Sequence, residues 1–251
     1  PDFISSFEYQ DKVYFFFRET AVEYINCGKA RFSRVARICK NDRGGPPILK
    51  SEWTSFFKAR LNCSLPGEYP FYFDEIQSTS DLGMGNVLSS LSVSDSTAMV
   101  YAVFTTPQNS IPGSAVCAFR FSDIMKAFEG KFKEQQTPQS SWLPVEDKKT
   151  PSPHPAKSCV NDSHQISPKT LDFIKTHPLM DKAVPAFGGA PVLLRANLDS
   201  HRLTTIAVDW QVRTADGRFY DVLYLGTSNG HVLKAINVGG SGDAIQTVVI
   251  G

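Results

Sequence analysis

The run Lys12-Val13-Tyr14-Phe15-Phe16-Phe17 is a lysine followed by five apolar residues, and similar runs recur at Met99-Val100-Tyr101-Ala102-Val103-Phe104 and Asp221-Val222-Leu223-Tyr224-Leu225-Gly226. Continuous apolar runs of this length, without polar alternation, are typical of β-strands that are covered on both faces. Such strands lie in the middle of a sheet. The sequence therefore predicts three repeats, each a sheet built around one of these runs.

Each central run is flanked by other candidate strands in the same order. We expect a first strand over 3–9, 71–80 and 203–212, a third over 34–40, 115–121 and 232–238, and a weaker fourth over 56–63, 192–196 and 246–250. Four strands per repeat is the composition of a β-propeller blade. The blade-like units cover about 1–64, 70–197 and 202–251. Because a propeller needs roughly four to eight blades to close, the expected fold is all-β and about three blades of a larger ring.

The connections between the predicted strands differ in length. Asn229-Gly230 stands between two apolar runs and predicts a tight hairpin in the third repeat. The second repeat is instead interrupted over about 123–190 by an insertion that does not resemble sheet. Its stretch 138–154 is rich in Pro, Ser and Lys and is expected to be an irregular loop anchored by Trp142. Long insertions on a rigid scaffold often carry recognition.

Two short helices are expected within the insertion. Ser122 and the following aspartate suit the start of the first, which Gly130 would end. Ser167 suits the N-cap of the second, with Pro168 at its first position and Pro178 beyond its end.

The composition of the 251-residue chain, with 41% hydrophobic and 20% charged residues, excludes a disordered or fibrous protein. The 26 basic and 25 acidic residues nearly cancel, so no basic field points to nucleic acid or an anionic membrane as a partner. No apolar run approaches the roughly 20 residues that span a bilayer. The first residues do not resemble a signal peptide, and we expect the chain to be a piece of a longer protein.

The chain contains five cysteines: Cys27, Cys39, Cys63, Cys117 and Cys159. No two lie within the short spacing that a zinc site needs. Buried reduced thiols are the ordinary alternative to disulfides. Two N-glycosylation sequons, Asn62-Cys63-Ser64 and Asn161-Asp162-Ser163, favour a secreted protein, in which disulfides persist. The pairing stays open at this point, because five cysteines allow many arrangements of two bridges with one cysteine left over.

Several motifs follow one another in a fixed order along the chain: Val13-Tyr14-Phe15-Phe16-Phe17-Arg18-Glu19, Arg37-Ile38-Cys39-Lys40-Asn41-Asp42, Lys58-Ala59-Arg60-Leu61-Asn62-Cys63-Ser64, Gly113-Ser114-Ala115-Val116-Cys117, Trp142-Leu143-Pro144-Val145, Thr176-His177-Pro178-Leu179-Met180, Leu225-Gly226-Thr227 and Gly230-His231-Val232-Leu233-Lys234. In this order they resemble the sema domain of the semaphorin family, over essentially the whole chain. Glu23-Tyr24-Ile25-Asn26-Cys27-Gly28-Lys29 and Ile111-Pro112-Gly113 resemble most the invertebrate class 1 and class 2 members, with class 1 favoured.

The resemblance implies a seven-bladed β-propeller in which the insertion is the extrusion of the fifth blade, so that the repeats are blades four, five and six. It implies an extracellular guidance ligand, either secreted or anchored to the cell surface outside this fragment. Such a ligand forms a homodimer, binds plexin receptors and steers axon growth and cell migration. No catalytic step, cofactor, metal or small-molecule substrate belongs to it.

By the same resemblance Cys39 pairs with Cys159, and Cys63 pairs with Cys117. Cys27 is left over in a polar loop. Three interpretations of it remain: an intermolecular disulfide to Cys27 of a second copy, an exposed reactive thiol, or a buried free thiol.

Both sequons are expected to carry N-linked glycans. Asn161 is expected in an exposed loop, whereas Asn62 is expected on an outer strand, where glycosylation could be skipped.

Two rival functions remain beside the guidance ligand. One is a receptor-side sema domain, of the plexin or receptor tyrosine kinase type. The other is a propeller hydrolase or sialidase, but the paired acids Asp74-Glu75 and Glu146-Asp147 carry no sign of a cleft that would raise a carboxyl pKa. The five histidines are scattered without metal-site or nucleophile spacing. We expect the chain not to be an enzyme.

Overall fold

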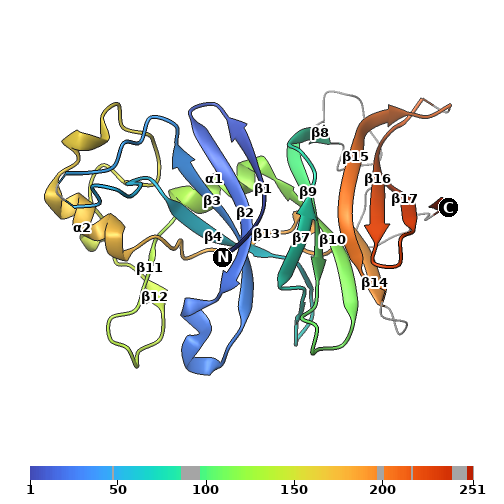
Figure 1. The fold of residues 1–251 in the computed structure, drawn as a ribbon, viewed down its shortest axis with the longest axis horizontal. Helices are drawn as coiled ribbons and strands as arrows, with labels where there is room; N and C mark the ends of the chain where they lie inside the picture. The colour runs from blue at the N-terminus through green and yellow to red at the C-terminus, as the bar shows by residue number, and fades with distance from the viewer. Residues whose placement is uncertain (47, 86–96, 197–200, 216, 239–247, 251) are drawn as a thin grey trace. The chain divides into compact units, whose positions relative to one another are not determined.

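The computed structural model describes residues 1–251 except 47, 86–96, 197–200, 216, 239–247 and 251 (Figure 1). The chain divides into two compact units. Unit 1 comprises Pro1–Leu61 and Ile124–Val184, and unit 2 comprises Asn62–Asp123 and Pro185–Gly251. Strands account for most of the regular structure, as the sequence predicts, and the helices are few.

The main sheet of unit 1 has the strand order β1-β2-β3-β4-β13. Its strands are β1 (Asp2–Tyr9), β2 (Lys12–Thr20), β3 (Arg31–Cys39), β4 (Phe57–Asn62) and β13 (Val184–Pro185). The expected central run is β2, which pairs with β1 on one side and β3 on the other. Phe16 and Phe17 point to opposite faces of β2 and are both buried, so the prediction of a doubly covered central strand is confirmed.

The fifth strand of this sheet comes from the insertion, which the sequence did not indicate. Leu179 forms a parallel bridge with Lys58 of β4, through hydrogen bonds from Lys58 N to Pro178 O (2.8 Å) and from Met180 N to Lys58 O (2.8 Å). The chain then continues to β13. The expectation that the insertion contains no sheet is therefore wrong for this segment, because β4 offers an unpaired edge that the insertion covers.

Unit 2 contains the other two predicted repeats as two sheets (Figure 1). The first has the order β14-β10-β9-β7, and β8 also pairs with β9. Its strands are β7 (Glu75–Thr79), β8 (Gly83–Gly85), β9 (Thr97–Thr105), β10 (Gly113–Arg120) and β14 (Leu193–Ala196). The second consists of β15 (Leu203–Arg213), β16 (Phe219–Thr227), β17 (Val232–Asn237) and β18 (Val248–Ile250), in that order. The expected central runs are β9 and β16, and each lies between two partner strands.

One predicted strand, over 71–80, is wrong as a single element. The structure has β6 (Phe71–Tyr72), which pairs with β5 (Ser64–Leu65), and a separate β7 that pairs with β9. The amide of Phe73 donates to the carbonyl of Cys63 at 2.9 Å, and this bond directs the chain away from the sheet. The break arises from a contact that is distant in sequence, which strand propensity does not register.

The two sheets of unit 2 pack against each other through one apolar core. Its buried members are Met99, Tyr101, Val103, Val116, Ala118, Leu193, Leu203, Ile206, Leu223, Leu225, Leu233 and Ala235. Burial of each large aliphatic side chain stabilises such a core by about 1.5–3 kcal/mol. Trp210 lies over Gly83, where a Cβ atom would come within 2.1 Å of the indole ring, so this close approach requires glycine.

A polar cluster lies inside this core. The hydroxyl of Tyr101 donates to Asp221 Oδ2 at 2.8 Å and accepts from Asn237 Nδ2 at 2.8 Å, and Asp221 Oδ1 accepts from the amide and the side chain of Gln211. Burial, followed by the nearby Asp221 charge, raises the pKa of Tyr101 well above its ordinary value, so the phenol stays protonated as a donor. The cluster joins one sheet to the other by directional bonds.

The predicted helices are confirmed as α1 (Phe121–Glu129) and α2 (Pro168–Thr176). The Ser167 hydroxyl caps α2 by accepting from Thr170 N at 3.2 Å. The loop expected over 138–154 contains β12 (Leu143–Pro144), which pairs with β11 (Lys133–Glu134). Its buried anchor is Val145, whereas Trp142 is only half-buried. Neither described helix has the length and apolar character that a membrane crossing requires.

Among the described residues the structure also has four short 3-10 helices: η1 (Val22–Cys27), η3 (Asp147–Lys149), η4 (Ser163–Gln165) and η5 (Phe187–Gly189). The predicted hairpin at Asn229-Gly230 is confirmed between β16 and β17. Thr227 N donates to His231 O at 3.0 Å, and Gly230 N donates to Thr227 O at 3.1 Å. Gly230 has φ +83°, the left-handed conformation that a three-residue hairpin loop requires of its last residue.

We predict that Tyr101→Phe lowers the free energy of unfolding by about 1–3 kcal/mol, because one buried hydrogen bond is removed from each of Asp221 and Asn237. Urea unfolding of the ectodomain measures the change. Tyr220→Phe is the matched control in β16, because the Tyr220 hydroxyl makes no hydrogen bond to the residues that the structure describes. Equal stability of the two variants would contradict the prediction.

Candidate interaction site

A disulfide between Cys39 and Cys159 ties the insertion to the sheet of unit 1. Cys39 is the last residue of β3, and the Cα atoms of the two cysteines are 5.7 Å apart. The bridge closes a loop of 120 residues. Chain-entropy arguments assign such a loop about 4–5 kcal/mol of stabilisation. This is the pairing that the family resemblance implies.

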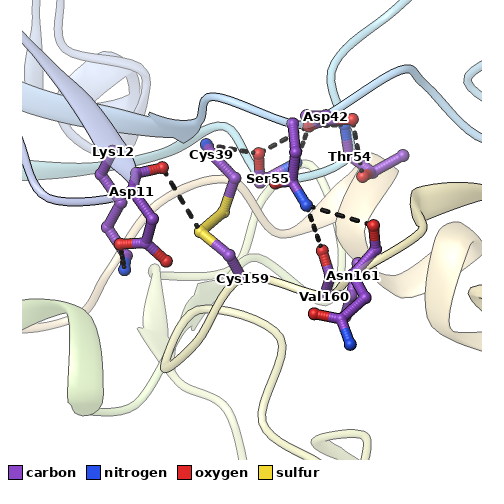
Figure 2. The surroundings of a disulfide bond; sticks show 10 residues. Asp11, Lys12, Cys39, Asp42, Thr54, Ser55, Cys159, Val160 and Asn161 are labelled. Carbon is purple, nitrogen blue, oxygen red and sulfur yellow. Dashed lines mark hydrogen bonds and ion pairs between the residues drawn. A yellow bond between two sulfur atoms is a disulfide. The ribbon is translucent and has the colours of Figure 1, made fainter.

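Asp42 fixes the chain that follows Cys39 (Figure 2). Its Oδ2 accepts from the amides of Thr54 and Ser55, both at 2.8 Å, and from the Ser55 hydroxyl at 2.5 Å. Its Oδ1 accepts from the amide of Gly44 at 3.0 Å. The Ser55 hydroxyl oxygen in turn accepts from the amide of Cys39 at 2.9 Å. The carboxylate therefore holds the disulfide's own backbone in place through one serine.

The irregular segment of the insertion beyond Cys159 is held by hydrogen bonds as well. Asn41 Nδ2 donates to the carbonyl of Val160 at 2.7 Å and to that of Asn161 at 3.2 Å (Figure 2). The amide of Arg43 donates to the Ser163 hydroxyl at 3.0 Å. Segments that are about 120 residues apart in sequence are therefore joined by a covalent bond and by several polar contacts.

The second disulfide joins Cys63 and Cys117 within unit 2. Cys63 lies between β4 and β5, Cys117 lies on β10, and both are buried. Their Cα atoms are 5.9 Å apart, and the bridge closes a loop of 54 residues. This pairing is also the one that the resemblance implies, and its burial marks it as part of the scaffold.

Cys27 is a free, exposed cysteine at the end of η1. The interpretation of Cys27 as a buried thiol is therefore wrong. Three large apolar side chains of the same helix are also exposed: Val22 (42%), Tyr24 (43%) and Ile25 (46%). Apolar groups clustered on a surface are typical of a contact with another protein.

The two glycosylation candidates lie in different surroundings. Asn161 is exposed, next to the Cys39–Cys159 bridge. Asn62 is half-buried at the end of β4, and its Oδ1 is buried without a hydrogen-bond partner among the described atoms. β4 is not an outer strand, because β13 pairs beyond it, so the expectation for the position of Asn62 is wrong.

No catalytic or metal-binding site is assembled in the part of the chain that the structure describes. Within it, no three His, Cys, Asp or Glu side chains gather where they could hold a metal ion. His154 stacks on Phe132 and bonds the carbonyl of Gly130 at 3.0 Å through Nε2. Burial lowers the pKa of His154, so its ring is neutral at physiological pH. His177 stacks on Phe173 at a ring separation of 4.1 Å. Both rings have packing roles.

A family comparison matches residues 76–250 to the sema domain. The chain belongs to the semaphorin family. It is 55% identical to Semaphorin-1A of Schistocerca americana over 252 aligned residues, which cover 100% of this chain and 34% of that protein. It is 44% identical to Semaphorin-2A of Schistocerca gregaria, over 100% of this chain and 34% of the relative. These identities agree with the expected preference for class 1 over class 2.

Solved structures show the same relationship for this semaphorin chain. Drosophila Semaphorin 1b, extracellular domains 1-2, superposes with a TM-score of 0.87 at 51% identity, over 99% of this chain and 47% of that one. Drosophila Plexin A in complex with Semaphorin 1b gives a TM-score of 0.86 at 50% identity, over 99% of this chain and 48% of that one. The full extracellular region of Plexin A4 is similar in fold alone, with a TM-score of 0.59 at 14% identity. The chain thus spans about a third of these two curated relatives and about half of the two semaphorin structures.

Sequence reasoning identified all five cysteines but missed the charged residues that fix the backbone near Cys39 and Cys27. Asp42 is followed two residues later by Gly44, a pattern typical of an Asx turn, and that signal was available. Glu23 and Arg34 form a buried ion pair beneath η1. No local pattern distinguishes them from ordinary surface charges, because their pairing depends on strand register.

We predict that the double variant Cys39→Ser, Cys159→Ser loses about 2–5 kcal/mol of stability and is cleaved by trypsin after the exposed Lys157 much faster than the wild type. Thermal unfolding and timed proteolysis measure the two effects. The control removes Cys63 and Cys117, a disulfide of unit 2, and is expected to leave cleavage at Lys157 unchanged. Equal acceleration in both double variants would show that Cys39–Cys159 has no local tethering role.

Proposed function

We propose that this chain is the central part of the sema domain of an extracellular semaphorin ligand that binds a plexin receptor. The observation that carries the proposal is the likeness to Semaphorin 1b, whose complex with Drosophila Plexin A is known, over 99% of this chain at 50% identity. Its expected setting is outside the cell, either secreted or as a cell-surface ectodomain anchored elsewhere in the protein. Its expected biological role is to steer axon growth and cell migration.

The proposed architecture is three blades of a seven-bladed propeller, with boundaries near 1–64, 70–197 and 202–251 and an extrusion over about 123–190. The strand order in each of the three sheets supports it, because one central strand is flanked by a preceding and a following neighbour in every case. The segment between β10 and β14 supports the proposed extrusion, because it carries both α-helices and because its Leu179 forms a bridge with Lys58 of β4.

A ligand is favoured over a receptor-side sema domain by the difference in identity. The chain shares 50–51% identity with Semaphorin 1b but 14% with Plexin A4. A likeness at 14% identity establishes the fold and nothing about the partner. The ligand function needs no cofactor, metal, nucleic acid or small-molecule substrate, and we propose none.

A homodimer linked through Cys27 is the proposed assembly. An exposed unpaired cysteine in a secreted protein favours an intermolecular bond, and a two-fold axis can bring two identical residues together. The exposed Val22, Tyr24 and Ile25 beside it supply apolar surface for such a contact. Two linked ligands can engage two receptors at once, which raises the apparent affinity.

We predict that the wild-type ectodomain migrates as a covalent dimer in non-reducing electrophoresis and that Cys27→Ser migrates as a monomer. On a surface of immobilised plexin A ectodomain, loss of the second binding event should weaken apparent affinity by about tenfold or more. Surface plasmon resonance measures this.

The covalent homodimer and the receptor function are refuted by different outcomes. Wild type and Cys27→Ser that both migrate as monomers would refute the covalent homodimer. Absence of plexin binding by a folded wild-type ectodomain would refute the receptor function, whatever its mass. Asp74→Asn with Glu75→Gln is the control for the rival hydrolase, and it is expected to leave plexin binding unchanged.

We predict N-linked glycans on the protein made in a secretory host, with Asn161 occupied more fully than the half-buried Asn62. Intact mass before and after glycosidase treatment measures occupancy. Asn161→Gln should remove one glycan from most molecules, and Asn62→Gln from a smaller share. An unchanged glycan mass in Asn161→Gln would contradict the assignment.

A further inference from the structure

The helix that ends in Cys27 needs outside support to keep one conformation. η1 is a six-residue 3-10 helix with no buried residue. Hydrogen-bond geometry in 3-10 helices is poor, and they are short for that reason. Gly28, directly after Cys27, has φ +132°, a conformation that glycine permits. The orientation of Cys27 therefore depends on side chains that anchor η1 to the rest of unit 1.

Glu23 provides the principal anchor. Arg34 of β3, whose side chain is fully buried, donates from Nη1 to Glu23 Oε1 at 2.6 Å and from Nη2 to Glu23 Oε2 at 2.7 Å. This is a bidentate pair, in which two parallel bonds fix the relative orientation of guanidinium and carboxylate as well as their distance. The side chain of Glu23 is only 11% exposed.

Two further charged residues, Glu19 and Lys58, hold Arg34 in place. Arg34 Nε donates to Glu19 Oε1 at 3.0 Å, and Lys58 Nζ lies 2.7 Å from the same oxygen. These four residues form a line of alternating charges from β4 to η1. Burial raises the pKa of Glu23, but its hydrogen bonds and the charge of Arg34 lower it more, so the carboxylate remains ionised at neutral pH.

Asn26 provides a second anchor, directly before Cys27. Its Nδ2 donates to the carbonyls of Pro138 at 3.3 Å and Ser140 at 3.4 Å, in the loop between β11 and β12. Gln135 Nε2 donates to the same two carbonyls. The insertion therefore supports η1 at one end, and the sheet supports it through Glu23.

In η1 the charged side chain faces inward and the apolar side chains face outward, the reverse of their positions in an ordinary surface helix. The charged Glu23 faces inward, while Val22, Tyr24 and Ile25 are 42–46% exposed. A buried ion pair contributes little net stability relative to apolar side chains, because desolvation of two charges offsets their attraction. The best-attested contribution of a buried ion pair is to select one arrangement of the elements that it joins. Here that arrangement keeps apolar groups and a thiol on the outside.

We propose that Glu23 is a positioning residue: held by Arg34, it fixes η1 so that Cys27 faces a second copy of this chain. The inference rests on the homodimer proposed above and names the residue that makes the bond form efficiently. The two Cys27 thiols, one on each copy, form the disulfide by exchange with a small disulfide oxidant such as oxidised glutathione, which takes up the two electrons and two protons and leaves as two thiols. Glu23 touches neither sulfur and acts only through the conformation of η1.

The first test compares disulfide formation in Glu23→Gln and the wild-type ectodomain, each reduced and then reoxidised with the same concentration of oxidised glutathione. Non-reducing electrophoresis over time gives the rate of covalent dimer formation. Loss of a charged bidentate pair should slow it by about fivefold or more. Glu8→Gln is the matched control: it removes an exposed pair with Lys40 from the same sheet, with Glu8 71% exposed, and should behave as wild type.

The second test needs no dimer. In a Cys27→Ser background, trypsin cleavage after the exposed Lys29 reports opening of η1. Glu23→Gln should accelerate this cleavage by about tenfold, whereas cleavage after Lys157 should stay near that of the parent. Removing one partner of a buried ion pair lowers the melting temperature in either case, so the two cleavage rates are the readout. A general loss of folding would accelerate both cleavages, whereas a positioning role accelerates only the one after Lys29.

The outcomes distinguish the inference from the homodimer. A wild type without a Cys27-dependent bond would refute the homodimer, and with it any role of Glu23 in presenting Cys27. A wild type that forms the bond while Glu23→Gln forms it equally fast would refute the positioning role alone. Unchanged cleavage after Lys29 in Glu23→Gln would refute it as well.

Discussion

The Cys39–Cys159 disulfide is the constraint on which unit 1 depends. Unit 1 is built from two stretches of chain that the strands of unit 2 separate in sequence, and this bridge joins them across 120 residues. Once the two stretches are joined, the insertion can add β13 to the sheet, and its β11–β12 loop can support Asn26. Covalent closure reduces the conformational freedom that these weaker contacts would otherwise have to restrict.

Buried and half-buried charges, rather than further apolar contacts, determine the details of both units. Asp42 organises the turn beside the disulfide, Arg34 holds Glu23 beneath η1, and Asp221 links two sheets through Tyr101. Each carboxylate is satisfied by several donors, as a buried charge requires. Apolar packing tolerates several arrangements of similar energy, whereas directional bonds select one.

The molecule therefore separates a buried scaffold from an exposed element that other segments of unit 1 hold in place. Doubly covered strands such as β9 supply rigidity, and Cys63–Cys117 lies entirely within that buried scaffold. Exposed apolar residues and the free thiol gather on η1, a short element whose conformation other segments impose. A rigid support under a small exposed element lowers the entropy lost on association, which is how pre-organised interfaces gain affinity.

The central strands, the hairpin at Gly230 and the capped helix at Ser167 could be predicted from the sequence alone, because each depends on residues that are close together in the chain. Ordered motifs also identified the family and implied both cysteine pairs. The folded structure was needed to establish that residues 71–80 break into two strands, that β13 covers the edge beside Asn62, and that Cys27 is exposed. It alone revealed the pairing of Glu23 with Arg34. Each of these depends on contacts between distant segments, and local propensity and periodicity carry no information about which distant residues meet.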